Sequence, residues 1–215
     1  LYQAPFDAEW VASAETVIEM MKTHFYDESE GDFYYTAAEH THLLTAIHSG
    51  MDVPLPAGTT LAAFALLKLG HLKEDTEMLA LAEEVLQKRS GMAAQQPDAY
   101  MFTLSAIRFA TNSARQIVVT GNAGEGQTEA FFTTLRDMFL PNSVIAFRDM
   151  SVSKTDTLTS RVPLTAGKEP VDGKPTVYVC QDFSCRAPVT DIQQLVETLN
   201  VSSANSRGET SDVKE

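Results

Sequence analysis

The sequence predicts a mostly α-helical protein with a small α/β part. As far as residue 110, apolar residues recur every three to four positions, which is typical of the buried faces of helices. At Arg115 this period gives way to short continuous apolar runs, which are typical of buried strands. We therefore expect helical hairpins over residues 1–112, a small α/β part over 113–199 and a disordered tail over 200–215.

The first expected helix covers residues 8–25, with Asp7 as its N-cap. An acidic turn follows at 27–32, and Phe33 and Tyr35 on alternate positions indicate a short extended piece. The apolar residues expected on one face of this helix are Trp10, Ala14, Val17, Ile18, Met21 and Phe25.

Three further helices complete the predicted hairpins. An apolar helix over 61–69 has Thr59 or Thr60 as its cap and Gly70 as the glycine that ends it. Short loops then join it to the other two, which is typical of stacked helical hairpins. These are expected over residues 74–89 and, opened by Pro97, over 98–110.

The α/β part begins with a strand–helix–strand unit, for which we expect a parallel strand pair and a right-handed crossover. A long polar loop and a third strand follow, and a short helix ends this part. The expected ranges, in order, are strand 116–120, glycine loop 121–126, helix 128–139, strand 144–147, loop 151–173, strand 176–180 and helix 192–199.

The charge of the chain argues against two classes of partner. Sixteen Lys and Arg oppose 29 Asp and Glu, a formal net charge of −13. Such a surface repels phosphate backbones and anionic lipids, so we expect neither nucleic acid nor a membrane as partner. No run approaches the about 18 apolar residues of a membrane span. We expect a cytoplasmic setting, and a chain that starts at Leu1 without Met is expected to be a fragment of a longer protein.

Two motifs have spacings found at cofactor or metal sites. The loop from Gly121 to Thr128 has phosphate-loop spacing, but Gln127 stands where that motif needs Lys, so a tight turn between strand and helix is favoured. Cys180 and Cys185 could form a disulfide, contribute to a metal site or remain two structural thiols. We favour the two thiols, and expect neither a cofactor nor a metal.

The segment from Gly31 to Gly70 holds the candidate site. His40, His42 and His48 lie within nine residues, close to Glu39 and Asp52. An imidazole beside a carboxylate can act as a general base, and epimerisation or hydrolysis of a sugar needs such a positioned acid–base pair. Loop histidines gathered by chance remain the alternative. The predicted catalytic residues are His40 as acid–base with Glu39 or Asp52 orienting it, and the predicted substrate-binding residues are His42, His48, Pro56 and Gly58.

Five segments in order resemble one protein family. The segments are FYYTAAEH, DVPLPAGTT, RQIVVTG, LPNSVIAF and GKPTVYVCQDFSCRAPVTD. They resemble the C-terminal end of the thioredoxin-domain-containing, spermatogenesis-associated family. The resemblance implies a partial (α/α) toroid of the six-hairpin glycosidase type, akin to N-acylglucosamine 2-epimerases. It also implies that the missing N-terminal thioredoxin-like and toroid segments are partners of this chain, and that a small-molecule sugar is a candidate ligand.

The site residues of that family match this chain unevenly. His40, Asp52, Pro56 and Gly58 agree with the family pattern, whereas three alanines replace an acid, an arginine and a serine of that pattern. Two hypotheses follow: a sugar-handling enzyme, or a non-catalytic helical scaffold that accompanies a redox domain. The three replacements are Ala38, Ala46 and Ala57.

Overall fold

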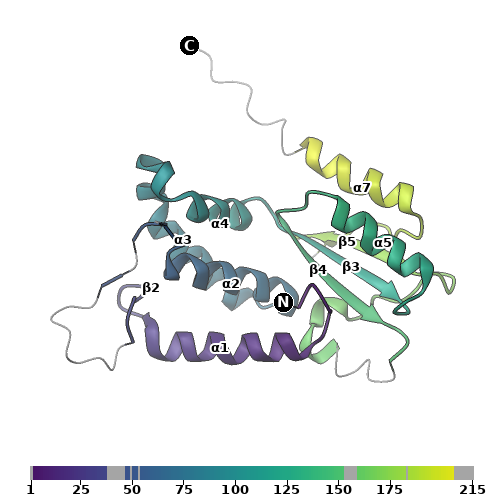
Figure 1. Cartoon of the computed structure of the whole chain (residues 1–215), viewed down its shortest axis with the longest axis horizontal. Coiled ribbons are helices and arrows are strands. Elements are labelled where there is room, and N and C mark those ends of the chain that lie inside the picture. The colour runs from purple at the N-terminus through teal and green to yellow at the C-terminus, as the bar shows by residue number, and fades with distance from the viewer. Residues whose placement is uncertain are drawn as a thin grey trace, which may run out of the picture. The chain divides into compact units, whose positions relative to one another are not determined.

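The computed structural model describes residues 2–37, 47–48, 50–52, 54–152, 159–182 and 184–205. Two compact units divide the chain, Leu1–Ser113 and Ala114–Glu215. The first contains helices α1 to α4, and the second contains the sheet with helices α5 and α7 (Figure 1). This confirms a mostly α-helical protein with a small α/β part.

Helix α1 (Glu9–Phe25) begins where the sequence predicts but buries only part of the predicted face. The Asp7 carboxylate accepts a hydrogen bond from the Glu9 N–H at 3.0 Å. Val11 and Ile18 are buried, whereas Trp10 and Val17, predicted on the buried face, are 43% and 62% exposed. The buried stripe is narrow because α1 packs mainly on one helix, α2 (Gly58–Lys73).

Helix α2 starts before either threonine predicted to cap it. Thr59 and Thr60 lie inside the helix, and their hydroxyls bond to other elements rather than to the helix end. Thr59 Oγ1 donates to the Phe33 carbonyl at 3.2 Å, and Thr60 Oγ1 lies 2.8 Å from Thr103 Oγ1. The predicted threonine cap is therefore wrong, because these hydroxyls are used in packing.

Gly70 does not end α2, and the prediction that it does is also wrong. A Cβ at Gly70 would lie 2.8 Å from Leu79 Cδ2, so the glycine allows the next helix to approach closely. The helix continues to Lys73, and Glu74 takes the left-handed conformation with φ of 54°. Gly70 thus serves packing between helices rather than termination.

The remaining helices of the first unit are α3 (Thr76–Gln95) and α4 (Met101–Thr111). Asp75 caps α3, because its carboxylate accepts from the N–H groups of Glu77 and Met78, both at 3.0 Å. Pro97 opens a 3₁₀ turn (Pro97–Ala99) before α4 rather than the helix itself. A two-stranded hairpin, β1 (Tyr26–Asp27) with β2 (Asp32–Phe33), follows α1 at the acidic turn.

The second unit is built on a four-stranded sheet in the order β4-β3-β5-β6. Strands β3 and β4 are parallel, as predicted, and α5 connects them, while β5 is antiparallel to β3. The elements are β3 (Arg115–Gly121), α5 (Gly126–Asp137), β4 (Ser143–Asp149), β5 (Thr176–Gln181), β6 (Ser184–Cys185) and α7 (Ile192–Asn205).

Two segments predicted to be an irregular loop and a disordered tail contain buried or helical residues. Within the expected polar loop, Val162 and Leu164 are buried, and the Thr165 carbonyl accepts a 3.0 Å bond from buried Arg148. Helix α7 runs to Asn205, into the range expected to be a disordered tail. Residues 153–158 and 206–215 of these two segments lie outside the described residues. Across the described part of the chain, no helix has both the length and the apolarity that crossing a membrane requires.

Candidate functional site

The structure describes four of the seven predicted site residues: His48, Asp52, Pro56 and Gly58. Predicted catalytic residues His40 and Glu39, and His42, lie outside the described residues. The chain on either side of them is paired, because the Tyr35 N–H donates to the Ile47 carbonyl at 2.8 Å and Tyr34 forms a β-bridge with His48. His48 is thereby held beside strand β2.

Asp52 is bound by the starts of two helices. One carboxylate oxygen accepts from the Ala57 N–H at 2.8 Å, just before α2. The other accepts from Thr103 in the first turn of α4, from its N–H at 2.8 Å and from its hydroxyl at 2.9 Å. A negative charge is favoured at both helix N-termini, so Asp52 holds α2 and α4 together. That Asp52 orients His40 stays a prediction.

His48 lies against a buried ion pair. Arg89, 2% exposed, places Nη2 2.6 Å from the Asp32 carboxylate. His48 Nδ1 is 3.5 Å from the same Asp32 oxygen and 3.2 Å from the Phe33 carbonyl. A carbonyl oxygen only accepts, so Nδ1 carries the hydrogen, and in the neutral ring Nε2 is the acceptor.

A second carboxylate acts on the same hairpin through Tyr34. The Tyr34 ring stacks on the His48 ring with centroids 4.5 Å apart and planes 30° apart. Its hydroxyl donates to the Asp27 carboxylate. The pKa of Asp27 is lowered to about 2, and this bond is the largest cause, with the bond from the Ser29 side chain as the second. The same bond is the largest cause of the raised pKa of Tyr34.

The described residues therefore bring His48 together with Asp32, Arg89 and Tyr34, but not with Asp52. An imidazole with a carboxylate at its Nδ1 side has the arrangement of an oriented acid–base group. The prediction omitted Asp32, Tyr34 and Arg89. The signal for Arg89 was present: it continues the apolar face of its helix, three residues after Leu86, where a charge indicates a buried partner.

The glycine loop after β3 uses its backbone internally. The Ala123 N–H donates to the Asp149 carboxylate at 3.1 Å, and the Gln127 side chain donates to the Thr190 carbonyl at 2.7 Å. The Asp149 carboxylate thus takes a loop N–H that a phosphate group would otherwise need. This agrees with a tight turn rather than a phosphate site.

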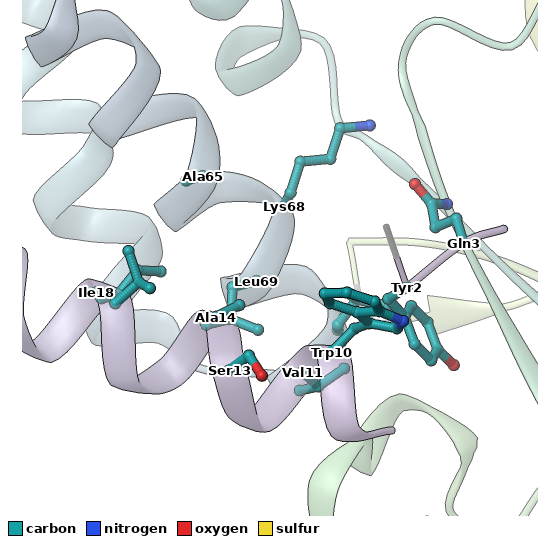
Figure 2. Close-up of a pocket in the computed structure, with 12 residues that line it drawn as sticks. Tyr2, Gln3, Trp10, Val11, Ser13, Ala14, Ile18, Ala65, Lys68 and Leu69 are labelled. Carbon is teal, nitrogen blue, oxygen red and sulfur yellow. The ribbon is translucent and has the colours of Figure 1, made fainter. Parts of the chain in front are cut away.

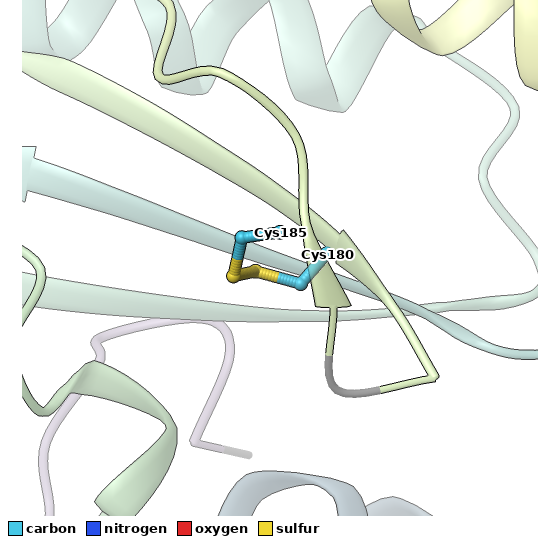
Figure 3. The surroundings of a disulfide bond; sticks show 2 residues. All are labelled: Cys180 and Cys185. Atoms are coloured by element: carbon cyan, nitrogen blue, oxygen red, sulfur yellow. A yellow bond between two sulfur atoms is a disulfide. The ribbon is translucent and has the colours of Figure 1, made fainter.

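Cys180 and Cys185 form a disulfide (Figure 3). The prediction of two thiols is wrong, because the register of β5 and β6 pairs the two residues directly, with Cα atoms 3.9 Å apart. Cys180 is buried and Cys185 is exposed. Among the described residues, no three His, Cys, Asp or Glu side chains are grouped so that they could hold a metal ion.

Two grooves in the helical unit lie apart from the predicted site. One, of about 520 Å³, is lined by residues of α1, α2 and the N-terminal segment (Figure 2). The other, of about 420 Å³, is lined by residues of α3 and α4. None of the four described site residues lines either groove.

Comparison with known proteins gives one set of distant relatives. The chain is 23% identical over 201 residues to spermatogenesis-associated protein 20 of Rattus norvegicus and 22% identical to the protein of that name of Homo sapiens. The Mus musculus protein of the same name is 23% identical over 205 residues. No family model matches the chain. The match covers 93% of this chain, which spans 25% of the length of these relatives.

Proposed function

We propose that residues 2–113 are a non-catalytic helical scaffold, an interaction domain in a longer protein that also carries a thioredoxin-like redox domain. The observation that carries the proposal is the bonding of Asp52. Both of its oxygens accept bonds from residues at the starts of α2 and α4. A carboxylate used in this way stabilises helix packing, whereas a general base must reach a proton on a substrate.

Other features support the same proposal. The three alanines that replace polar groups of the family pattern would leave a scaffold unaffected, and helical hairpins that formed an arc of a toroid would offer a flank to a neighbour. The relatives are much longer than this chain, which spans 25% of their length. The scaffold would then present surfaces to the rest of such a protein.

A second candidate is a sugar-handling site, epimerase-like or hydrolase-like. The observation in its favour is the contact of His48 with Asp32, combined with a His48 side chain that is 32% exposed. His48 could serve as the acid–base group directly, or bind a sugar for which His40 and Glu39 provide the chemistry. Arg89 would hold the Asp32 carboxylate in place and so keep the imidazole oriented.

Calorimetric titration of the 215-residue chain with neutral hexoses, N-acylated amino sugars and their disaccharides distinguishes the two candidates. The scaffold proposal expects no binding heat at millimolar sugar. Binding that is lost in His48→Ala or His40→Ala, with the circular dichroism spectrum unchanged, would overturn it in favour of the sugar site. Lys22→Ala is a matched control, since Lys22 is an exposed residue of α1 and has none of the contacts with His48, Asp32 or Arg89 described above.

A further inference from the structure

The disulfide at the edge of the sheet joins an exposed cysteine to a buried one. Cys185 is an exposed residue of β6, which is the last strand in the order β4-β3-β5-β6. Cys180 lies in β5, between β3 and β6, and is only 1% exposed. Figure 3 shows the two residues joined where β5 and β6 lie side by side. Exchange at a disulfide requires a thiolate to reach one of its sulfur atoms, so an external thiol has access through Cys185.

The sheet has backbone pairing around this bond that does not depend on it. All six residues of β5 pair with β3. On the other side of β5, the Arg186 N–H donates to the Val179 carbonyl at 3.0 Å, and Val177 and Val189 exchange two backbone bonds, at 2.7 and 2.9 Å. These bonds remain when the sulfur–sulfur bond is broken, so we expect opening of the disulfide to be local.

The same pairing holds the two cysteines together when the bond is open. The register places Cys180 directly opposite Cys185, and their sequence separation is 5. A cross-link that closes so short a loop removes little entropy from the unfolded chain, so it adds little stability by that route. In the folded chain, however, a Cys180 thiolate stays within reach of Cys185, at an effective concentration far above that of a thiol in solution.

We propose that the Cys180–Cys185 disulfide is a thiol–disulfide exchange site whose reductant is a dithiol. In the first step, a thiolate of the dithiol attacks Sγ of Cys185. A mixed disulfide forms as the Cys180–Cys185 bond breaks, and Cys180 leaves as a thiolate that takes up a proton. In the second step, the other thiolate of the dithiol attacks the dithiol's own sulfur in the mixed disulfide, and Cys185 leaves as a thiolate that is protonated. The two cysteines gain two electrons, and the dithiol loses two electrons and becomes a disulfide.

The position of Cys180 is the reason for the choice of a dithiol. A monothiol joined to Cys185 would be expelled by the Cys180 thiolate held opposite, and the original disulfide would close again. A dithiol has a second thiol that completes the reduction before this return. The exchange site lies within the second unit, so the proposal stands whichever of the two candidate functions of the helical unit holds.

The rate of reduction of the 215-residue chain tests whether the folded protein reacts. The oxidised chain is treated with dithiothreitol in buffer and in concentrated urea, quenched with iodoacetamide and analysed by mass spectrometry. We expect the rate in buffer to be within about tenfold of the rate in urea, with an unchanged circular dichroism spectrum after reduction. A rate in buffer of about a thousandth of the urea rate or less would mean that only unfolded chains react, and would overturn the proposal. Loss of the folded spectrum on reduction would also overturn it.

Single-cysteine variants test which sulfur is attacked. Cys180→Ala leaves Cys185 as the only cysteine of the chain, and Cys185→Ala leaves Cys180. With oxidised glutathione, Cys180→Ala should form its mixed disulfide at least about tenfold faster than Cys185→Ala, because only Cys185 is exposed. Equal rates in two folded variants would contradict attack at Cys185. The measurement on the parent chain decides the proposal if either variant does not fold.

A comparison of reductants tests the role of the second thiol. At equal thiol concentration, reduced glutathione should open the parent disulfide to an extent at least about tenfold smaller than dithiothreitol does, without accumulation of a mixed disulfide. The glutathione adduct should accumulate only in Cys180→Ala, where the residue that expels it is absent. Accumulation of the adduct on the parent chain would show that Cys180 does not return to Cys185, and the proposed preference for a dithiol would be wrong.

Discussion

Two carboxylates of the helical unit, those of Asp52 and Asp32, are bound inside the protein by different kinds of donor. Asp52 accepts from Ala57 and Thr103, mainly through backbone N–H groups at helix starts. One oxygen of Asp32 accepts from the Phe33 N–H at 2.8 Å, and the other is bound by side chains, with Arg89 Nη2 at 2.6 Å and His48 Nδ1 at 3.5 Å. The first carboxylate therefore meets partial charges fixed by the backbone, and the second meets a full charge and a titratable ring.

This difference indicates which of the two carboxylates has a structural role and which could take part in acid–base chemistry. Backbone donors cannot be removed by substitution, so a side chain without an acceptor oxygen in place of Asp52 leaves them without their acceptor. Of the groups bound to Asp32, only the Phe33 N–H is backbone, and the Arg89 and His48 side chains can be replaced together with Asp32. Only Asp32, of the two, contacts an imidazole among the described residues, so a search for acid–base chemistry should begin at Asp32 and His48.

The largest effect is expected from Asp52→Ala. Three hydrogen bonds to a carboxylate are lost, and the donors at Ala57 and Thr103 remain near the protein interior. We expect the free energy of unfolding to fall by about 4 kcal/mol, as measured by urea denaturation. Asp52→Asn keeps one acceptor oxygen and should lose about half as much. Equal, small losses in both variants would show that Asp52 does not hold α2 and α4 together.

A smaller loss is expected from Arg89→Met, which leaves the Asp32 carboxylate without its guanidinium. Asp32 is 14% exposed and keeps its contact with His48, so we expect a decrease of about 3 kcal/mol in the free energy of unfolding. The double variant Arg89→Met with Asp32→Asn removes the buried charge and should recover part of that loss. If the double variant is no more stable than Arg89→Met, the Asp32 charge left without Arg89 is not the cause of the loss.

The helices and strands were predictable because their signals are local. Apolar spacing gives the existence of α1 to α4, and the apolar runs give β3 and β4. Boundaries were less predictable where packing decides them. Glycine is common just after the last residue of a helix, yet Gly70 lies inside α2, where the close approach of Leu79 from the neighbouring helix leaves no room for a side chain. Likewise, the exposure of Trp10 depends on which helix covers α1, and this is not encoded within α1.

The candidate site was predictable only in part, because its contacts span long sequence separations. Asp32 and Arg89 are 57 residues apart, and Asp52 and Thr103 are 51 apart. The clustering of histidines drew the prediction to their own segment, whereas the partner of His48 lies in the acidic turn before it. The disulfide shows the same limit at short range, because strand register decides whether Cys180 meets Cys185.

The smallest effect concerns Asp27, a third carboxylate, which has a tyrosine hydroxyl as donor. In Tyr34→Phe the ring can still stack on His48 but the largest cause of the lowered Asp27 pKa is gone, so this pKa should rise from about 2 towards its ordinary value. It should not rise fully, because the Ser29 hydroxyl and N–H still donate, at 2.7 and 2.9 Å. NMR titration of the Asp27 carboxyl carbon measures this shift.

The sign of the pH dependence follows from the lowered pKa. Because Asp27 titrates lower in the folded than in the unfolded chain, its contribution to stability is complete above the unfolded pKa and is lost as pH falls towards about 2. In Tyr34→Phe the free energy of unfolding should therefore fall less steeply as the pH becomes acidic. Near neutral pH its dependence on pH should change little. Tyr35→Phe is the matched control, since Tyr35 is 71% exposed and is not a cause of the Asp27 shift. An Asp27 pKa that is the same in Tyr34→Phe and Tyr35→Phe would show that the backbone and serine donors alone are sufficient to lower this pKa.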